Sequence, residues 1–114
     1  MAEGAWTRNR EGWAPTLLEM WGVPYAGSDA LALSLSLDKV YTKQVAGVRT
    51  PAFSVVAPGQ PATAPAAFPP FVKPRYEGTA KGIRPSSVAP DLASLHRVAA
   101  QVHSPYQHLS LSPF

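Results

Sequence analysis

Residues 71–83 read Phe71-Val72-Lys73-Pro74-Arg75-Tyr76-Glu77-Gly78-Thr79-Ala80-Lys81-Gly82-Ile83. The pattern predicts a strand that ends in a lysine, a proline that fixes the exit, and a loop of small and polar residues. A lysine at the end of a strand holds a point charge on a rigid element, which suits phosphate oxygens. Small loop residues leave backbone N–H groups uncovered, and successive N–H groups form anion-binding concavities. The stretch is therefore typical of a polyphosphate site whose loop folds over the phosphates as a lid.

A plainer interpretation fits the same stretch. A strand, a polar turn and a returning strand at Ile83-Arg84 make a β-hairpin, in which glycines are routine. Spacing alone favours the hairpin, because short motifs often occur by chance. The residues by themselves leave both interpretations open.

Two other groups of charges could serve an anionic ligand. Lys39 and Lys43 are four residues apart, so they share one face of a helix that begins at Asp38. The cluster Arg8-Asn9-Arg10-Glu11 precedes the first predicted helix and could orient a carboxylate substrate. Taken alone, each group is more typical of a solvated helix face or a polar helix entry.

Helices and short strands are predicted around these motifs from apolar periodicity and from capping and stop signals. The expected helices cover residues 11–21, 30–47 (broken near Ser36, with a new start at Asp38) and 90–103. The expected strands are 48–56, 71–72, 83–84 and, weakly, the tail 106–114. Residues 57–70 are rich in Pro and Ala and nearly free of charge, so we expect a long exposed loop there.

The composition narrows the class of protein. A chain of 114 residues usually forms one domain with a modest core. The net charge is +3 and the basic residues are scattered, which fits a small anionic ligand better than nucleic acid. The chain has no cysteine, which excludes disulfides, thiol nucleophiles and thiolate zinc sites. Neither a membrane-spanning run nor a signal peptide is visible, so we expect a cytoplasmic protein.

Other chemical signatures are missing from the sequence. It contains no Walker-type loop, no dinucleotide fingerprint and no nucleophile elbow. Three histidines show no metal-ligand spacing, and we expect His96 and His103 to face solvent from the last helix. No metal site is therefore predicted from the residues.

Five motifs follow one another along the chain. In order they are Ala2-Glu3-Gly4 with Arg8-Asn9-Arg10-Glu11; Leu17-Leu18-Glu19 with Gly22-Val23-Pro24-Tyr25-Ala26-Gly27-Ser28-Asp29; Leu37-Asp38-Lys39 with Thr42-Lys43; Gly47-Val48-Arg49-Thr50-Pro51; and Phe71-Val72-Lys73-Pro74 with Glu77-Gly78-Thr79 and Gly82-Ile83. Together they resemble D-alanine–D-alanine ligase-like proteins of the ATP-grasp family. The resemblance extends from Ala2 to Gln101 and fades after Val102.

The resemblance implies an α/β (α+β) fold that represents part of an ATP-grasp protein. Residues 1–28 would be the remnant of a doubly wound N-terminal substrate domain. Residues 29–114 would be the small, ATP-binding lobe, incomplete and interrupted by the loop 57–70. In that lobe an antiparallel sheet carries helices on one face.

The resemblance also implies an activity. The family joins a carboxylate to an amine: the carboxylate takes the γ-phosphate of ATP, and the amine of a second amino acid attacks the acyl phosphate. Mg²⁺ and lysines offset the developing charge. By this match ATP contacts Lys39, Lys73, Glu77, Gly78, Thr79 and Ala80, and the residues near the first substrate are Glu3, Gly4, Arg10 and Glu11. Expected partners are ATP and amino-acid or dipeptide-like substrates, with no nucleic acid or membrane; a homodimer stays open.

The sequence departs from the family pattern in three places. Thr79-Ala80 stands where members often carry two serines, so one hydroxyl is lost. The helix between Lys39 and Gly47 is shorter than usual by about one turn. No acidic residue follows Asp91, so the Mg²⁺ ligands of the family are absent. We therefore expect an ATP-binding portion without a complete catalytic set, inactive alone; the alternative is a non-catalytic ATP-binding or protein-interaction remnant.

Overall fold

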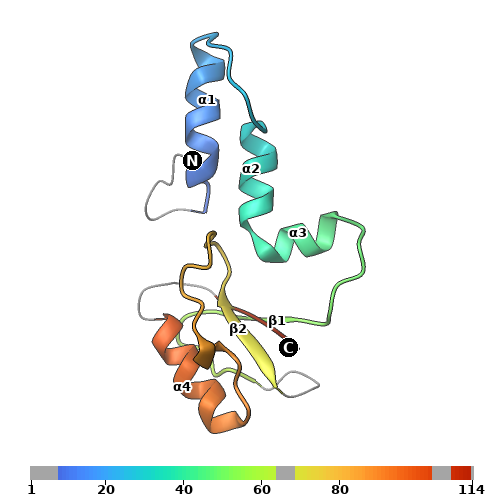
Figure 1. Cartoon of the computed structure of the whole chain (residues 1–114), viewed down its shortest axis with the longest axis vertical. Coiled ribbons are helices and arrows are strands. Elements are labelled where there is room, and N and C mark those ends of the chain that lie inside the picture. The colour runs from blue at the N-terminus through green and yellow to red at the C-terminus, as the bar shows by residue number, and fades with distance from the viewer. Residues whose placement is uncertain (1–7, 64–68, 104–108, 114) are drawn as a thin grey trace. The chain divides into compact units, whose positions relative to one another are not determined.

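The computed structural model describes residues 8–63, 69–103 and 109–113 (Figure 1). The chain forms two compact units, Met1–Ala46 and Gly47–Phe114, which are considered separately below. This division falls later in the sequence than the predicted boundary between residues 28 and 29. The assignment of those stretches to two ligase domains stays a prediction. Within the described ranges, no helix is long and apolar enough to cross a bilayer.

The first unit is helical. A 3-10 turn, η1 (Arg10–Gly12), leads into α1 (Trp13–Met20), and α2 (Ala30–Leu37) and α3 (Lys39–Val45) follow. Helices α1 and α2 lie side by side (Figure 1). A Cβ at Gly12 would approach the backbone oxygen of Ala30 to 3.0 Å, so the glycine permits close packing of η1 on α2.

Two aspartates set the starts of α2 and α3. The Asp29 carboxylate accepts a hydrogen bond from the N–H of Ala32 at 2.7 Å. Asp38 is 2% exposed, and its Oδ1 accepts from the N–H groups of Val40 at 2.9 Å and Tyr41 at 3.3 Å. Because Asp38 itself is extended, it ends one helix and caps the next. The predicted break and the new start at Asp38 are confirmed.

The second unit is built on a three-stranded antiparallel sheet. Its strands are β1 (Ser54–Val56), β2 (Pro70–Pro74) and β3 (Leu109–Pro113), in the order β1-β3-β2. The weakly predicted tail strand is thus the central one, and the strand predicted at 48–56 is limited to its last three residues. Prolines at both ends of β2 fit its position at an edge of the sheet, because proline cannot donate to a ladder.

The strand predicted at residues 83–84 is wrong. The ladder partner of β2 is β3, and the returning chain forms a short 3-10 helix, η2 (Pro85–Ser87). Pro85 cannot donate a ladder hydrogen bond, and the Ser87 hydroxyl accepts from the N–H of Arg84 at 3.0 Å, which stabilises the turn. Beyond η2 the chain meets β2 at an isolated bridge between Phe71 and Val88, where the N–H of Ala89 donates to the carbonyl of Pro70 at 2.9 Å. The hairpin interpretation of residues 71–84 is therefore wrong.

Helix α4 (Leu92–His103) covers one face of this sheet. The core lies between them and consists of Val56, Ala62, Val72, Ala89, Leu95, Val98, Ala99, Val102 and Leu111. Leu95, Ala99 and Val102 of α4 are buried, whereas Leu92 is half exposed in the first turn. At the start of α4, hydrogen bonds from Ser94 hold the pKa of the Asp91 carboxyl below its usual value.

Candidate functional site

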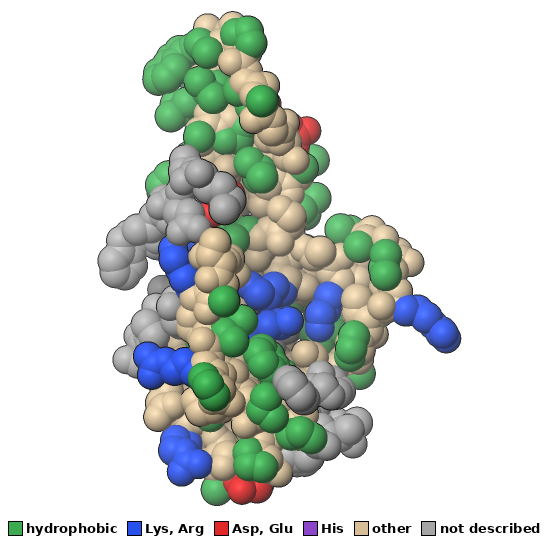
Figure 2. All heavy atoms as spheres, in the orientation of Figure 1, with side chains coloured by type: hydrophobic (Ala, Val, Ile, Leu, Met, Phe, Trp, Pro, Cys, Tyr) green, Lys and Arg blue, Asp and Glu red, His purple; other side chains and the backbone are tan. Residues whose placement is uncertain are grey.

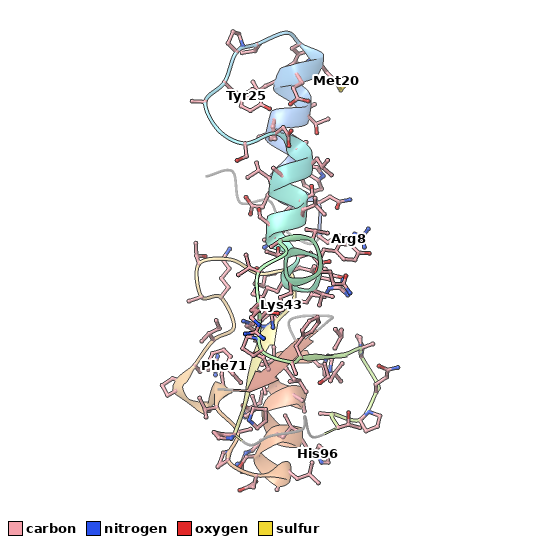
Figure 3. All side chains as sticks on the ribbon, turned by 90° about the vertical axis from the view of Figure 1, so that its right-hand side faces the viewer. Arg8, Met20, Tyr25, Lys43, Phe71 and His96 are labelled. Carbon is pink, nitrogen blue, oxygen red and sulfur yellow. The ribbon has the colours of Figure 1, made fainter. Side chains whose placement is uncertain are left out.

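Strand β2 places Lys73 on the face of the sheet that α4 does not cover. Side chains alternate along a strand, and Pro70, Val72 and Pro74 are buried. Phe71 and Lys73 are half-buried and lie on the other face; Figure 3 labels Phe71. The Lys73 Nζ lies 5.9 Å from the centroid of the Phe71 ring, a cation–π contact that steadies the lysine.

The loop after β2 contains a tight turn in an uncommon backbone conformation. The N–H of Lys81 donates to the carbonyl of Gly78 at 2.9 Å, across Thr79 and Ala80. These two residues have φ values of 48° and 59°, in the left-handed region. A left-handed residue with a Cβ costs roughly 1–2 kcal/mol, so the turn is strained. Gly82 also has a positive φ, 74°, which glycine adopts without this cost.

Gly78 is not required by the structure of the chain itself. Its backbone is outside the left-handed region, and a Cβ built on it meets no atom within 4 Å. A glycine is otherwise unfavourable in a folded chain because it loses more conformational freedom than other residues. The space beside Gly78 is therefore open to a ligand that approaches the backbone closely.

The segment around this turn is strongly positive. Between residues 73 and 84 it carries Lys73, Arg75, Lys81 and Arg84 against the single carboxylate of Glu77. The Arg75 guanidinium lies over the Tyr76 ring, 4.9 Å from its centroid, which orients it next to the loop. An excess of cations beside exposed loop backbone favours an anionic ligand.

The first unit presents two other cations on α3. Lys39 is its first residue, and Lys43, which Figure 3 labels, follows four residues later, a spacing that puts both on one helix face. A positive charge in the first turn opposes the helix dipole, so helix stability does not explain Lys39. Its predicted contact with phosphate stays a prediction.

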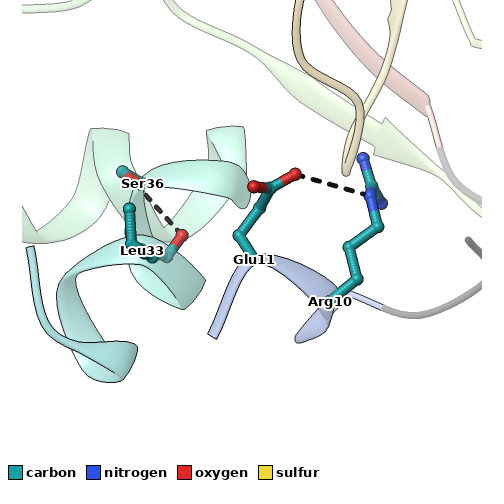
Figure 4. A network of polar contacts seen from close by, with 4 residues as sticks. All are labelled: Arg10, Glu11, Leu33 and Ser36. Carbon is teal, nitrogen blue, oxygen red and sulfur yellow. Dashed lines mark hydrogen bonds and ion pairs between the residues drawn. The ribbon is translucent and has the colours of Figure 1, made fainter. Parts of the chain in front are cut away.

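The residues predicted near the first substrate are only partly described. Arg10 is 5% exposed, and its Nε lies 3.7 Å from Glu11 Oε1 (Figure 4). The same figure shows the Ser36 hydroxyl donating to the carbonyl of Leu33. Glu3 and Gly4 lie outside the described residues.

The structure thus places five of the predicted ATP contacts in one continuous strand and loop of the second unit: Lys73, Glu77, Gly78, Thr79 and Ala80. Lys39, Arg10 and Glu11 belong to the first unit. Across residues 8–63, 69–103 and 109–113, no three His, Cys, Asp or Glu side chains converge as metal ligands do.

A surface hollow that the sequence did not indicate lies between α4 and the turn after β1. It measures about 440 Å³ and is lined by Gly59, Gln60, Pro61, Ala62, His96, Ala99, Ala100 and His103. The His96 Nε2 lies 3.1 Å from the carbonyl of Ala62. Both ring nitrogens of His103 are buried, so the expectation that this side chain faces solvent is wrong. Helical periodicity describes α4 by itself and does not show which other segments bury His103.

Comparison with known proteins relates this chain to one enzyme class. No protein-family model matches it. It is 39% identical to the D-alanine–D-alanine ligase of Pseudomonas entomophila over 94 residues, which cover 77% of this chain and 30% of that enzyme. It is also 41% identical to the uncharacterized protein y4sG of Sinorhizobium fredii over 87 residues, which cover 74% of this chain and 26% of that protein. The chain spans less than a third of the length of these relatives.

The fold is also found in a solved ligase structure. The D-alanine–D-alanine ligase of Bacillus anthracis complexed with ATP matches 91% of this chain with a TM-score of 0.77, at 22% identity. The match covers 36% of that protein. At this identity the likeness concerns the fold, a set of helices with a small antiparallel sheet, as the sequence predicted.

Proposed function

The chain is homologous to one part of the D-alanine–D-alanine ligases, and we propose on that basis that it binds the phosphates of ATP. In this proposal Lys73 contacts a phosphate oxygen, and the loop of Glu77, Gly78, Thr79 and Ala80 closes over the phosphate chain. A phosphate contact of Lys39, in the first unit, is a separate proposal that rests on the sequence alone.

Two observations carry the proposal: the position of Lys73 near the end of β2, and the open space at Gly78 in the loop that follows. Lys73 lies on the face of β2 turned away from the core, and the loop follows directly. At Gly78 neither the backbone conformation nor a neighbouring atom requires glycine, so the absence of a side chain leaves free space there. A rigid cation beside accessible backbone N–H groups is the arrangement that polyphosphate requires.

Each residue of this segment has a defined task. Lys73 neutralises charge on the phosphates, and the N–H groups of the loop donate to their oxygens. Thr79 adds one hydroxyl donor, whereas Ala80 adds none. Bound ATP would supply the γ-phosphate that activates a carboxylate for attack by an amine.

Ligation itself is the less direct part of the proposal. A relative of this chain is named D-alanine–D-alanine ligase. We propose that the protein of which this sequence represents a part also joins a carboxylate to an amine. For the chain alone we propose nucleotide binding without ligation, and we assign it no Mg²⁺ ligand. A cytoplasmic location and amino-acid substrates belong to the same proposal.

A matched pair of charge removals tests the assignment of Lys73. Lys73→Gln and Arg49→Gln each remove one positive charge from the second unit, but only Lys73 lies at the proposed site. Isothermal titration with ATP should give a dissociation constant raised at least about tenfold by Lys73→Gln, because a charge-assisted contact contributes roughly 1.5–3 kcal/mol. Arg49→Gln should leave it within about twofold.

Two results would contradict this assignment. Equal weakening by both substitutions would mean that ATP responds to net charge and not to a site. Equal affinity for ATP and adenosine would mean that the phosphates are not the recognised group.

A second candidate function, protein association, is favoured by apolar side chains exposed on α1.

A further inference from the structure

The loop that follows β2 adds a second cation close to Lys73. Arg75 comes directly after β2, two residues beyond Lys73, so the Cα atoms of the two residues lie within about 7 Å of each other. The Arg75 guanidinium lies 4.9 Å from the centroid of the Tyr76 ring, and this contact limits where it can point. Figure 2 shows Lys and Arg side chains, in blue, on the surface of the molecule. The end of β2 therefore carries two neighbouring positive charges.

The tight turn brings a third cation, Lys81, back towards Gly78. The N–H of Lys81 donates to the carbonyl of Gly78 at 2.9 Å, so the two Cα atoms lie within about 7 Å across the turn. Lys81 is exposed, and a Cβ added at Gly78 would meet no atom within 4 Å. Arg75 stands three residues before Gly78 and Lys81 three residues after it. The open space beside Gly78 is thus flanked by positive charge on both sides along the chain.

Acidic side chains are scarce in the same part of the chain. Glu77 is the only carboxylate between residues 57 and 90, whereas Lys73, Arg75, Lys81 and Arg84 are cations, so four positive charges and one negative charge leave this stretch at +3. Mg²⁺ at a nucleotide site is bound by carboxylates together with the phosphates of the substrate. Here a divalent cation would meet one carboxylate among four like charges. The donor set of this segment therefore does not fit Mg²⁺.

We propose that this chain binds the triphosphate of ATP in its metal-free form, with the cations of the loop in the place of Mg²⁺. The inference rests on the proposed function, because it assumes that the phosphates lie at Lys73 and Gly78. Mg²⁺ carried by ATP would cancel two of the negative charges that the loop attracts, and it gives up its bound water reluctantly. The ligand class is a polyphosphate chain without metal, of which inorganic tripolyphosphate is the simplest example.

Isothermal titration of the full chain with ATP tests the inference in two buffers, one with EDTA and one with excess MgCl₂. Sodium chloride must match their ionic strengths, because salt screens the attraction between exposed charges. The dissociation constant should be at least about tenfold lower in EDTA, since three or four cations each lose part of their attraction when Mg²⁺ neutralises the phosphates. Inorganic tripolyphosphate in EDTA should compete with ATP.

Two charge variants separate the loop from Mg²⁺. Glu77→Gln removes the one carboxylate of the loop, so metal-free ATP should bind at least about twofold more tightly, with no loss of affinity for Mg²⁺-bound ATP. Lys81→Gln should weaken metal-free ATP by at least about threefold and bring the two dissociation constants closer together. Arg49→Gln, the matched control outside the loop, should leave the ratio of the two constants unchanged. Far-ultraviolet circular dichroism checks that each variant keeps its helices.

The possible failures of the inference and of the proposed function are distinguishable. Equal or tighter binding of ATP with Mg²⁺ would overturn the inference, while the proposed ATP binding would stand. Weaker binding of Mg²⁺-bound ATP in Glu77→Gln would identify Glu77 as a metal ligand and would also overturn it. Absence of ATP binding in both buffers would refute the proposed function, and the inference with it.

Discussion

Gly78→Ala should change stability and ligand affinity in opposite directions. Gly78 is outside the left-handed region, and an added Cβ meets no atom of the chain within 4 Å. Alanine at such a position stabilises a protein by about 0.4–1 kcal/mol, because it reduces the freedom of the unfolded chain. If phosphate oxygens approach the Gly78 backbone, the same Cβ displaces them and removes one or more charge-assisted hydrogen bonds, each contributing roughly 1.5–3 kcal/mol.

The expected result is thus a chain that is slightly harder to unfold and binds ATP at least about tenfold more weakly. Urea unfolding gives the first quantity and isothermal titration the second. Gly59→Ala is the matched control, because its added Cβ also meets no neighbour but its φ is +79°. The left-handed conformation should make Gly59→Ala destabilising by roughly 1–2 kcal/mol without an effect on ATP affinity.

The two glycine variants separate strain from ligand contact. Wild-type ATP affinity in Gly78→Ala would show that phosphate does not occupy the open space beside Gly78. The main structural support for the proposed site would then be removed. A loss of stability in Gly78→Ala would show that the loop needs glycine for its own conformation. In either case the reasoning from the empty space beside Gly78 would be refuted.

Two further predictions concern the first unit. Asp38→Ala should destabilise the chain by about 1–2 kcal/mol in urea unfolding, because the buried carboxylate caps α3 through two N–H groups; Asp38→Asn, which can still cap, should lose less. The hydrogen bond to Glu19 raises the pKa of Tyr25 to about 12, so its contribution to stability is complete below pH 10 and disappears as pH rises through about 12. Ultraviolet titration should show one phenol that ionises with a midpoint of about 12. This transition should be absent in Tyr25→Phe, and its midpoint should fall towards 10 in Glu19→Gln. An unchanged midpoint in Glu19→Gln would exclude the Glu19 carboxylate as the cause of the raised pKa.

The parts of the fold that local chemistry determines could be predicted from the sequence. The break between α2 and α3 follows from one aspartate, Asp38, whose side chain accepts hydrogen bonds from residues two and three positions later. The sequence that predicts the break therefore lies within a few residues of Asp38. The strand partners could not be predicted in this way. Adjacency in sequence favours a hairpin at residues 71–84, whereas the actual partner of β2 is a distant segment, Leu109–Pro113.

In the candidate site, too, the local features could be predicted from the sequence and the others could not. Lys73 and the loop after it form one continuous segment, so a sequence motif is enough to predict that they lie together. The left-handed turn at Thr79 and Ala80 runs against the preference of both residues, and no local rule predicts it.

The central position of β3 has a consequence for how the second unit acquires its structure. β1 and β2 both form their ladders with β3 and not with each other. Both ladders therefore join segments that are far apart in sequence, which is the kind of pairing that forms slowly because a long loop must close first. The helices of the first unit depend on near neighbours and can form earlier. During synthesis, β1 and β2 emerge before their common partner, so neither ladder can form until residues 109–113 are available.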